Sequence, residues 1–163
     1  MILGFDIGNT DTVLAVFDRN RAPVPEGRFP TVRGATAADL SRAVDEILSR
    51  RHGPGCDVEG AIVSSVVGEV NASFMEMIRS RFSVDAVAVS PSCSLNITLR
   101  YDNPAQLGAD RIVNSAAGFH EYGAPLFIVD LGTATTCCAV LEGGVFDGGT
   151  IGPGIGLSAR ALA

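Results

Sequence analysis

Two short segments of the chain combine aspartate, glycine and threonine at nearly the same spacing. The first is Asp6-Ile-Gly-Asn-Thr10 and the second is Asp130-Leu-Gly-Thr133, and each ends an apolar run. A glycine lets the backbone approach a phosphate closely, and turn N–H groups and a threonine hydroxyl can donate to phosphate oxygens. An aspartate at a strand end can hold a divalent metal such as Mg²⁺, which keeps several waters. These residues predict two phosphate-binding turns.

One copy of this pattern is also what an ordinary hairpin turn looks like, because Asp and Gly are common turn residues. Both interpretations fit a single copy. Two copies at matching positions favour phosphate binding, and we expect the two turns to face each other across a cleft and hold a nucleotide's phosphates from both sides.

The apolar pattern indicates the elements that position the first turn. Residues 2–7 and 12–18 predict a β-hairpin, and a third strand is expected near 25–31. Further elements are a helix from Thr36 to near Gly53, a buried strand at 60–67, a helix capped by Asn71, a short strand at 84–89 and a helix at 104–121 that Gly123 stops.

The opening pattern then returns, with strands at 126–130, 136–141 and near 145–151 around the second turn. The resulting order is βββαβαβα followed by the first strands of a second such unit. This is an α/β chain with an internal duplication. We expect a first domain at 1–123 and the start of a second domain at 124–163.

Composition excludes several classes of protein. The fractions of hydrophobic residues, 47%, and charged residues, 18%, are typical of a globular chain. All 12 basic residues are arginine, so the lysine that P-loop proteins, protein kinases and pyridoxal enzymes require is missing. Phosphate chemistry must use carboxylates, a metal, backbone amides or arginine. The net charge of −6 argues against a nucleic-acid surface.

The remaining global features predict a cytoplasmic protein. The cysteines at 56, 93, 137 and 138 form no CxxC pair, so a zinc site is not expected. The first residues lack the basic segment of a signal peptide, and no apolar run approaches the roughly 20 residues of a membrane span. We therefore expect reduced thiols and no membrane partner.

Five motifs, in order, resemble those of the bacterial type III pantothenate kinase family. They are Asp6-Ile-Gly-Asn-Thr10, Tyr101-Asp-Asn-Pro104, Gly108-Ala-Asp-Arg111, Asp130-Leu-Gly-Thr-Ala-Thr-Thr136 and Gly148-Gly-Thr-Ile-Gly-Pro-Gly154. The resemblance covers essentially the whole chain. It implies an actin-like (ribonuclease H-like) ATPase fold. It also implies transfer of phosphate from ATP to the primary hydroxyl of pantothenate, giving 4'-phosphopantothenate, the first step of coenzyme A biosynthesis.

The resemblance also implies residue roles. Asp110 is the expected general base, and Asp6 and Asp130 are the expected acids near Mg²⁺. The phosphate-binding residues are Asp6, Gly8, Asn9, Thr10, Gly132 and Thr133. The pantothenate pocket is formed by Tyr101, Gly108, Ala109, Asp110 and Arg111. Family members also use a monovalent cation, K⁺ or NH₄⁺, and form homodimers.

The sequence departs from the family at two points. Cys138 stands where the family usually has an aspartate after the second phosphate turn, which weakens the expectation of a monovalent cation. The second domain is incomplete, so we expect a partial form with weak or no activity alone.

Two alternatives remain at this stage. One is a non-catalytic relative resembling Bvg accessory factor, which is associated with transcription. The other is a different small-molecule kinase on the same fold, such as a sugar or acetate kinase.

Overall fold

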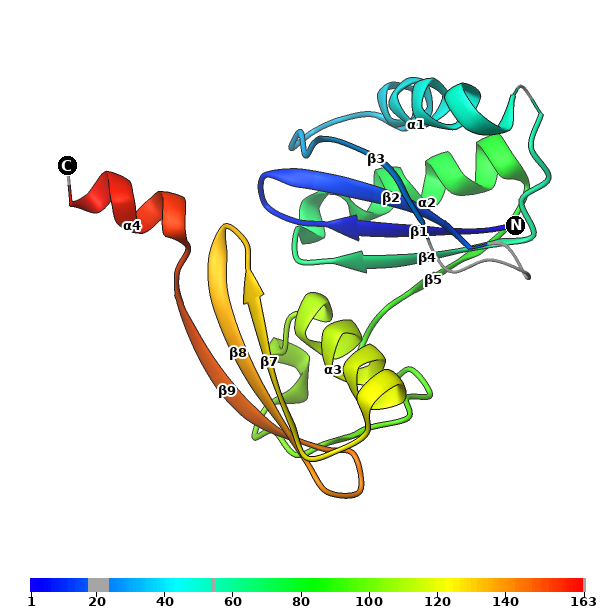
Figure 1. Ribbon diagram of the computed structural model, residues 1–163. Helices are drawn as coiled ribbons and strands as arrows, with labels where there is room; N and C mark the ends of the chain where they lie inside the picture. Colours follow the sequence, from blue (N-terminus) through cyan, green and yellow to red (C-terminus); the bar gives the residue numbers. More distant parts are fainter. Residues whose placement is uncertain (18–23, 54, 163) are drawn as a thin grey trace. The chain divides into compact units, whose positions relative to one another are not determined.

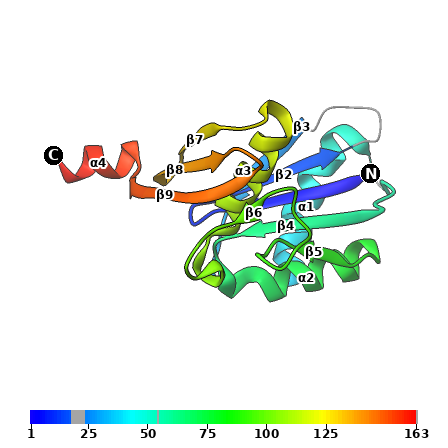
Figure 2. The ribbon, with the colours of Figure 1, turned by 90° about the horizontal axis from the view of Figure 1, so that it is seen from below.

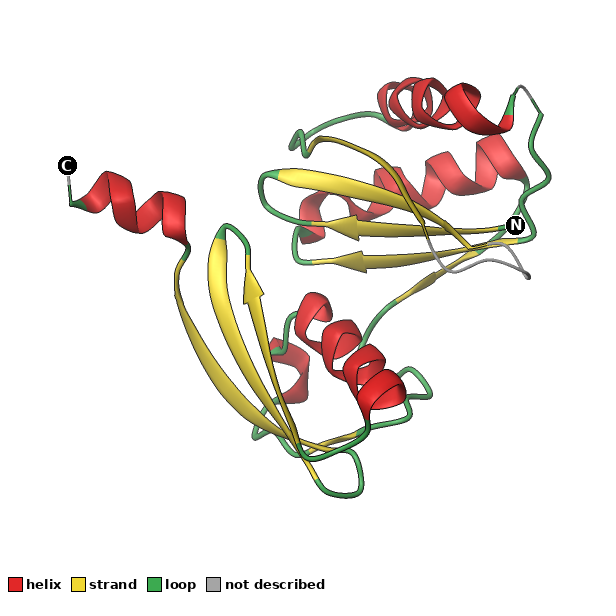
Figure 3. Cartoon of the chain, in the orientation of Figure 1, coloured by secondary structure: helices red, strands yellow, loops and turns green. Residues whose placement is uncertain are grey.

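The structure is a computed structural model that describes residues 1–17, 24–53 and 55–162. Its polypeptide divides into two compact units, Met1–Ala88 and Val89–Ala163, and each is described separately below. Figure 1 gives the element labels, and Figure 3 distinguishes helices from strands.

The first unit is a mixed five-stranded sheet with two helices. Its strand order is β3-β2-β1-β4-β5, in which β1 pairs antiparallel with β2 and parallel with β4. Strands β2 and β3 are antiparallel, and β4 and β5 are parallel. The elements are β1 (Ile2–Ile7), β2 (Asp11–Phe17), β3 (Val24–Pro30), α1 (Ala37–His52), β4 (Gly60–Ser65), α2 (Gly68–Phe82) and β5 (Ala86–Ala88).

Alternation along β1 decides which face of this sheet is covered. Leu3, Phe5 and Ile7 are fully buried, whereas Ile2 and Asp6, on the opposite face, are exposed. The buried side chains belong to one apolar cluster with the inner residues of α1 and α2. Both helices therefore pack on the same face, and the Asp6 carboxylate lies on the other one.

A capping box fixes the start of α1. The Thr36 hydroxyl accepts from the Asp39 backbone N–H, and Asp39 accepts from the Thr36 backbone N–H. Asp39 also pairs with Arg42 one turn later. Hydrogen bonds from the Thr36 side chain and backbone, and the Arg42 pair, lower the pKa of Asp39 below its usual value. Gly53 follows the last residue of the helix with a positive φ of 70°.

The second unit is built on a four-stranded sheet of order β6-β9-β8-β7 (Figure 2). Strands β7, β8 and β9 form an antiparallel meander, and the short β6 pairs parallel with β9. The elements are β6 (Thr98–Leu99), the 3₁₀ helix η1 (Pro104–Gln106), α3 (Ala109–Tyr122), β7 (Leu126–Leu131), β8 (Ala134–Leu141), β9 (Val145–Pro153) and α4 (Ile155–Ala161).

Only one face of the second sheet is covered in the described chain. Ile112 of α3 packs with Cys138 of β8 and Phe146 of β9, and all three are buried. On the opposite face of β7, Phe127 and Leu131 are each 65% exposed. This side of the strand is an open apolar surface.

The predicted order of elements is confirmed apart from the short strand β6, which was not predicted, and the two meanders repeat the same arrangement. β1-β2-β3 and β7-β8-β9 are both antiparallel, and Asp6 and Asp130 are each the next-to-last residue of the first strand. The expected domain boundary at 123 concerns this repeat, whereas the compact units divide after Ala88. The duplication boundary stays a prediction.

Two predicted boundaries are wrong for local reasons. Asn71 does not cap α2, because the helix already begins at Gly68 after Val67. The predicted helix at 104–121 is split, because a 3₁₀ turn at 104–106 precedes α3. Asp18, the last residue of a predicted strand, lies outside the described residues. Among the described helices, none is long and apolar enough to cross a membrane.

Removing the capping box should destabilise α1. We expect Thr36→Ala to lower the free energy of unfolding by about 1 kcal/mol at pH 7, measured by urea denaturation. Asp39→Asn should also destabilise at pH 7. Because the folded pKa of Asp39 is lowered from 3.8, its contribution is present above that value and lost as pH falls through the folded pKa. If Asp39→Asn lowered the free energy of unfolding equally at acid pH, the stabilisation would not come from the ionised Asp39 carboxylate.

Candidate functional site

The turn after β1, residues 8–10, is closed by backbone hydrogen bonds. The Gly8 N–H donates to the Asp11 carbonyl over 3.0 Å, and the Thr31 N–H donates to the Thr10 carbonyl over 2.9 Å. The Gly8 N–H is therefore used within the turn itself, and the role of Gly8 in phosphate binding stays a prediction. Gly8 shapes the turn that presents Asn9 and Thr10, which are both exposed.

The turn after β7, residues 132–133, is closed in a similar way. The Gly132 N–H donates to the Ala134 carbonyl over 3.0 Å. Asp130, directly before this turn, accepts a hydrogen bond of 3.1 Å from Asn114 Nδ2 of α3. In each predicted phosphate turn, the glycine N–H thus donates to the backbone carbonyl of the first residue of the next strand.

Gly154 lies against the backbone of the second turn. Its N–H donates to the Thr133 carbonyl over 3.1 Å. A Cβ at this position would lie 2.3 Å from the Gly132 carbonyl oxygen and 2.4 Å from that of Thr133, so only glycine fits without a shift. The last predicted motif therefore has a packing role, which its sequence alone did not assign.

The helix α3 relates two of the predicted acids. Asp110 lies in the first turn of α3, and one of its oxygens accepts from the Arg111 backbone N–H over 2.8 Å. Asn114 lies four residues later, on the same side of the helix, and bonds to Asp130. Asp110 and Asp130 therefore lie along the same side of α3. Sequence reasoning missed Asn114, although its i+4 spacing from Asp110 was a signal.

Arg111 is the buried cation of the second unit. It is 4% exposed, its Nε donates to Cys138 Sγ over 3.2 Å, and its guanidinium carbon lies 5.5 Å from the centre of the Phe146 ring. Burial lowers the pKa of Arg111, but hydrogen bonds to Cys138 and Tyr101 raise it on balance. Nη2 is buried and has no partner among the described residues. The predicted pocket residues Tyr101 and Arg111 are thus brought together.

The Cys138 position does not suit a monovalent cation. Its sulfur is buried and already accepts from a guanidinium, so a second positive charge would meet Arg111. Alkali cations also prefer oxygen ligands to thiols. None of the four cysteines forms a disulfide among the described residues.

The acids suit Mg²⁺ only together with a nucleotide. Among the described residues, no cluster of three His, Cys, Asp or Glu side chains could hold a metal by itself. Mg²⁺ is commonly bound by one or two carboxylates plus substrate phosphates and waters. Asp6 and Asp130 fit that donor set, each at the end of a strand beside a turn. They belong to different compact units, so their meeting around one phosphate group stays a prediction.

The strand order and the repeated meander define an α/β chain with the actin-like ATPase fold. A family model described as type III pantothenate kinase matches residues 2–163, and the chain belongs to this family. A type III pantothenate kinase of Geobacillus sp. (strain WCH70) is 40% identical over 162 residues, which are 99% of this chain and 62% of that protein. The chain therefore spans less than two thirds of the length of this relative.

One solved structure supports the fold, and a second is reported beside it. The ethanolamine utilization protein EutJ from Carboxydothermus hydrogenoformans superposes with a TM-score of 0.52 at 17% identity, over 93% of this chain and 51% of that chain. A ROK family glucokinase from Streptomyces griseus covers 93% of this chain and 47% of its own length, with a TM-score of 0.45 and 18% identity.

A methyl group at position 154 should disrupt the second turn. We expect Gly154→Ala to lower the free energy of unfolding by about 1–3 kcal/mol, because the new Cβ meets two carbonyl oxygens. Gly152→Ala is the matched control, since a Cβ there has no heavy atom within 4 Å. Equal thermal shifts for the two variants would show that Gly154 does not support the turn.

The Cys138 sulfur should be needed to satisfy Arg111. We expect Cys138→Ala to lower the free energy of unfolding by about 1–3 kcal/mol, because a buried guanidinium N–H loses its acceptor. Cys138→Ser should lose less, since a hydroxyl also accepts. Cys137→Ala, at the half-buried neighbour on the opposite face of β8, is the control for chemical denaturation.

Proposed function

We propose that this chain is the part of a pantothenate kinase that carries both phosphate turns and the catalytic base. The reaction is ATP-dependent phosphorylation of pantothenate to 4'-phosphopantothenate, the first step of coenzyme A biosynthesis. Membership of the family supports this proposal. The observation that carries it for the residues is the arrangement along α3, in which Asn114 binds Asp130 and lies one turn from Asp110.

In the proposed reaction, the primary hydroxyl oxygen of pantothenate attacks the γ-phosphorus of ATP. Asp110 takes the hydroxyl proton, a P–O bond forms, and the bond to ADP breaks. One Asp110 oxygen holds the Arg111 N–H, which leaves the other oxygen for the proton. Asn114 orients Asp130 by donating to one of its oxygens.

The proposed nucleotide contacts are divided between the two turns. Asn9 and Thr10 donate to phosphate oxygens, while Gly8 acts by shaping its turn. Gly132 and Thr133 form the second turn, with Gly154 beneath it. Bound Mg²⁺, held by Asp6 and Asp130, would supply neutralisation of phosphate charge.

Arg111 provides the fixed positive charge of the proposed pantothenate pocket. Its Nη2 is buried and has no partner among the described residues, so Arg111 acts on an acidic substrate through its charge and not by direct contact. Tyr101 and Phe146 surround it, with ring centres 6.2 Å apart. Gly108 and Ala109 set the backbone entry into α3 beside this group. We further propose a cytoplasmic homodimer, and free thiols suit a reducing compartment.

A chimera gives the sharpest test of this function. This chain would replace the matching 62% of the Geobacillus relative, and phosphopantothenate formation would be followed with Mg²⁺ and ATP. We expect activity in the chimera, and Asp110→Asn should lower kcat by about 10²- to 10⁴-fold with little change in ATP affinity. Asp6→Asn should instead weaken binding of Mg·ATP.

Equilibrium binding of Mg·ATP to the unmodified chain is the companion measurement. A folded chimera that binds ATP but does not phosphorylate pantothenate would contradict the kinase proposal. Turnover of a sugar or acetate in its place would identify another small-molecule kinase. Binding without any turnover would favour the non-catalytic relative, to which the Cys138 departure also points.

A further inference from the structure

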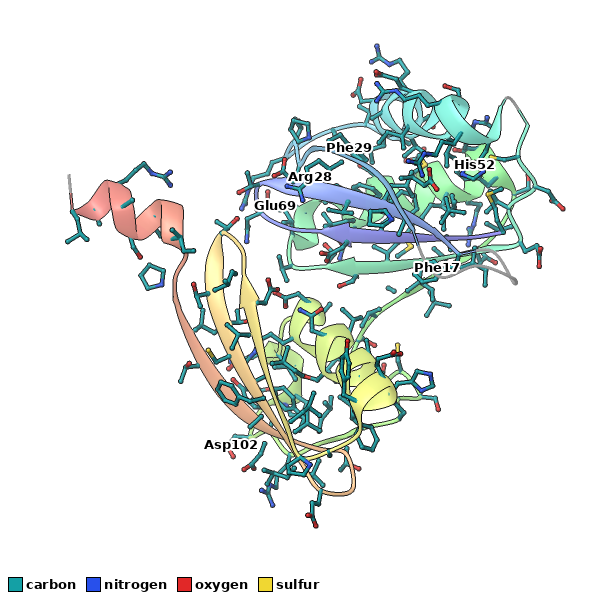
Figure 4. All side chains as sticks on the ribbon, viewed as in Figure 1. Phe17, Arg28, Phe29, His52, Glu69 and Asp102 are labelled. Atoms are coloured by element: carbon teal, nitrogen blue, oxygen red, sulfur yellow. The ribbon has the colours of Figure 1, made fainter. Side chains whose placement is uncertain are left out.

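Arg33, in the loop between β3 and α1, bridges the first turn and α2. Its Nη1 donates to Glu69 Oε1 over 2.8 Å, and its Nη2 donates to Asn9 Oδ1 over 3.3 Å. Figure 4 labels Glu69 at the start of α2. The same loop is tied to the turn by the bond from the Thr31 N–H to the Thr10 carbonyl. Three segments of the first unit therefore meet at one guanidinium.

This contact determines how the Asn9 side chain is oriented. A guanidinium only donates hydrogen bonds, so the atom of Asn9 that faces Arg33 must be the carbonyl oxygen. The amide group is planar, and its oxygen and nitrogen diverge from the same carbon. With Oδ1 bonded to Arg33, Nδ2 is the donor that remains for an anion.

We propose that Arg33 is a positioning residue for nucleotide binding. Anchored by Glu69, it holds the Asn9 amide so that Nδ2 donates to a phosphate oxygen of ATP. Without this contact the amide can rotate and present its oxygen, which repels phosphate. This inference rests on the proposed function of residues 8–10 and extends it to two residues outside every predicted motif.

The loop that carries Arg33 borders a cavity of about 400 Å³, whose apolar lining includes Phe29, Leu40 and Phe74. Arg33 and Gly34 line this cavity, whereas Ala35 of the same loop packs against the apolar core. The ion pair with Glu69 and the Thr31–Thr10 bond hold the part of the loop that carries Arg33.

The direction in which Glu69→Gln changes ATP affinity distinguishes this proposal from direct binding of phosphate by Arg33. If Arg33 bound phosphate itself, Glu69 would compete for the guanidinium, and Glu69→Gln would tighten ATP binding. If Arg33 acts through Asn9, Glu69 is its anchor, and Glu69→Gln weakens binding. The two side chains are 59% and 63% exposed, so their removal has little effect on folding.

The experiment measures the dissociation constant of Mg·ATP for the whole chain by calorimetry. We expect Arg33→Met and Glu69→Gln each to raise it about 3- to 10-fold, the range of one ordinary hydrogen bond. The double variant should be no worse than Arg33→Met. In an Asn9→Ala background, Arg33→Met should have no further effect. Arg33→Lys keeps the charge but cannot bridge both acceptors in a fixed geometry, so it should stay weakened.

The matched controls are Arg50→Met and Glu46→Gln, which remove an exposed pair with a 2.7 Å contact within α1. They change the net charge equally and should leave ATP affinity unchanged. Tighter binding by Glu69→Gln, or an additive loss in the Asn9→Ala background, would overturn the positioning role. Failure of the unmodified chain to bind ATP would overturn the phosphate turn and this inference together. ATP binding by the unmodified chain that is unchanged in Arg33→Met would overturn this inference alone.

Discussion

The structure depends on one backbone constraint that occurs twice: a glycine amide that bonds to a carbonyl of the returning strand directly after an aspartate-bearing strand. At both turns this bond narrows the hairpin enough for the next strand to pair in register. Because the aspartate is the next-to-last residue of its strand, its carboxylate is fixed beside the turn. The glycines therefore help to determine where Asp6 and Asp130 lie.

Charge in the second unit is organised around a single buried guanidinium. Burying an arginine without a carboxylate partner is unfavourable unless its N–H groups find acceptors. Here the Cys138 sulfur accepts from Nε, and the Phe146 ring lies against the guanidinium. Among the described residues, Arg111 therefore has a thiol and an aromatic ring as neighbours and no carboxylate partner.

Much of the fold could be predicted because strong local patterns agree with the tertiary structure. The alternation of Leu3, Phe5 and Ile7 and the capping residue Thr36 both specify their elements without long-range information. The start of α2 could not be found this way, because Gly68 enters the helix without any side-chain cap. Contacts between segments that are far apart in the sequence could not be predicted either. The local sequence does not indicate the Arg33–Asn9 bond, and it indicates Asn114 only through its i+4 spacing from Asp110.

The open face of β7 has a practical consequence. In the first unit, the corresponding residues of β1 lie under α1 and α2, whereas Phe127, Val129 and Leu131 meet solvent in the described chain. Dyes that fluoresce when they bind apolar surface will therefore show raised fluorescence with the native protein, before any heating. Melting curves recorded with such dyes will start from a raised baseline, and circular dichroism is the sounder way to follow unfolding of this molecule.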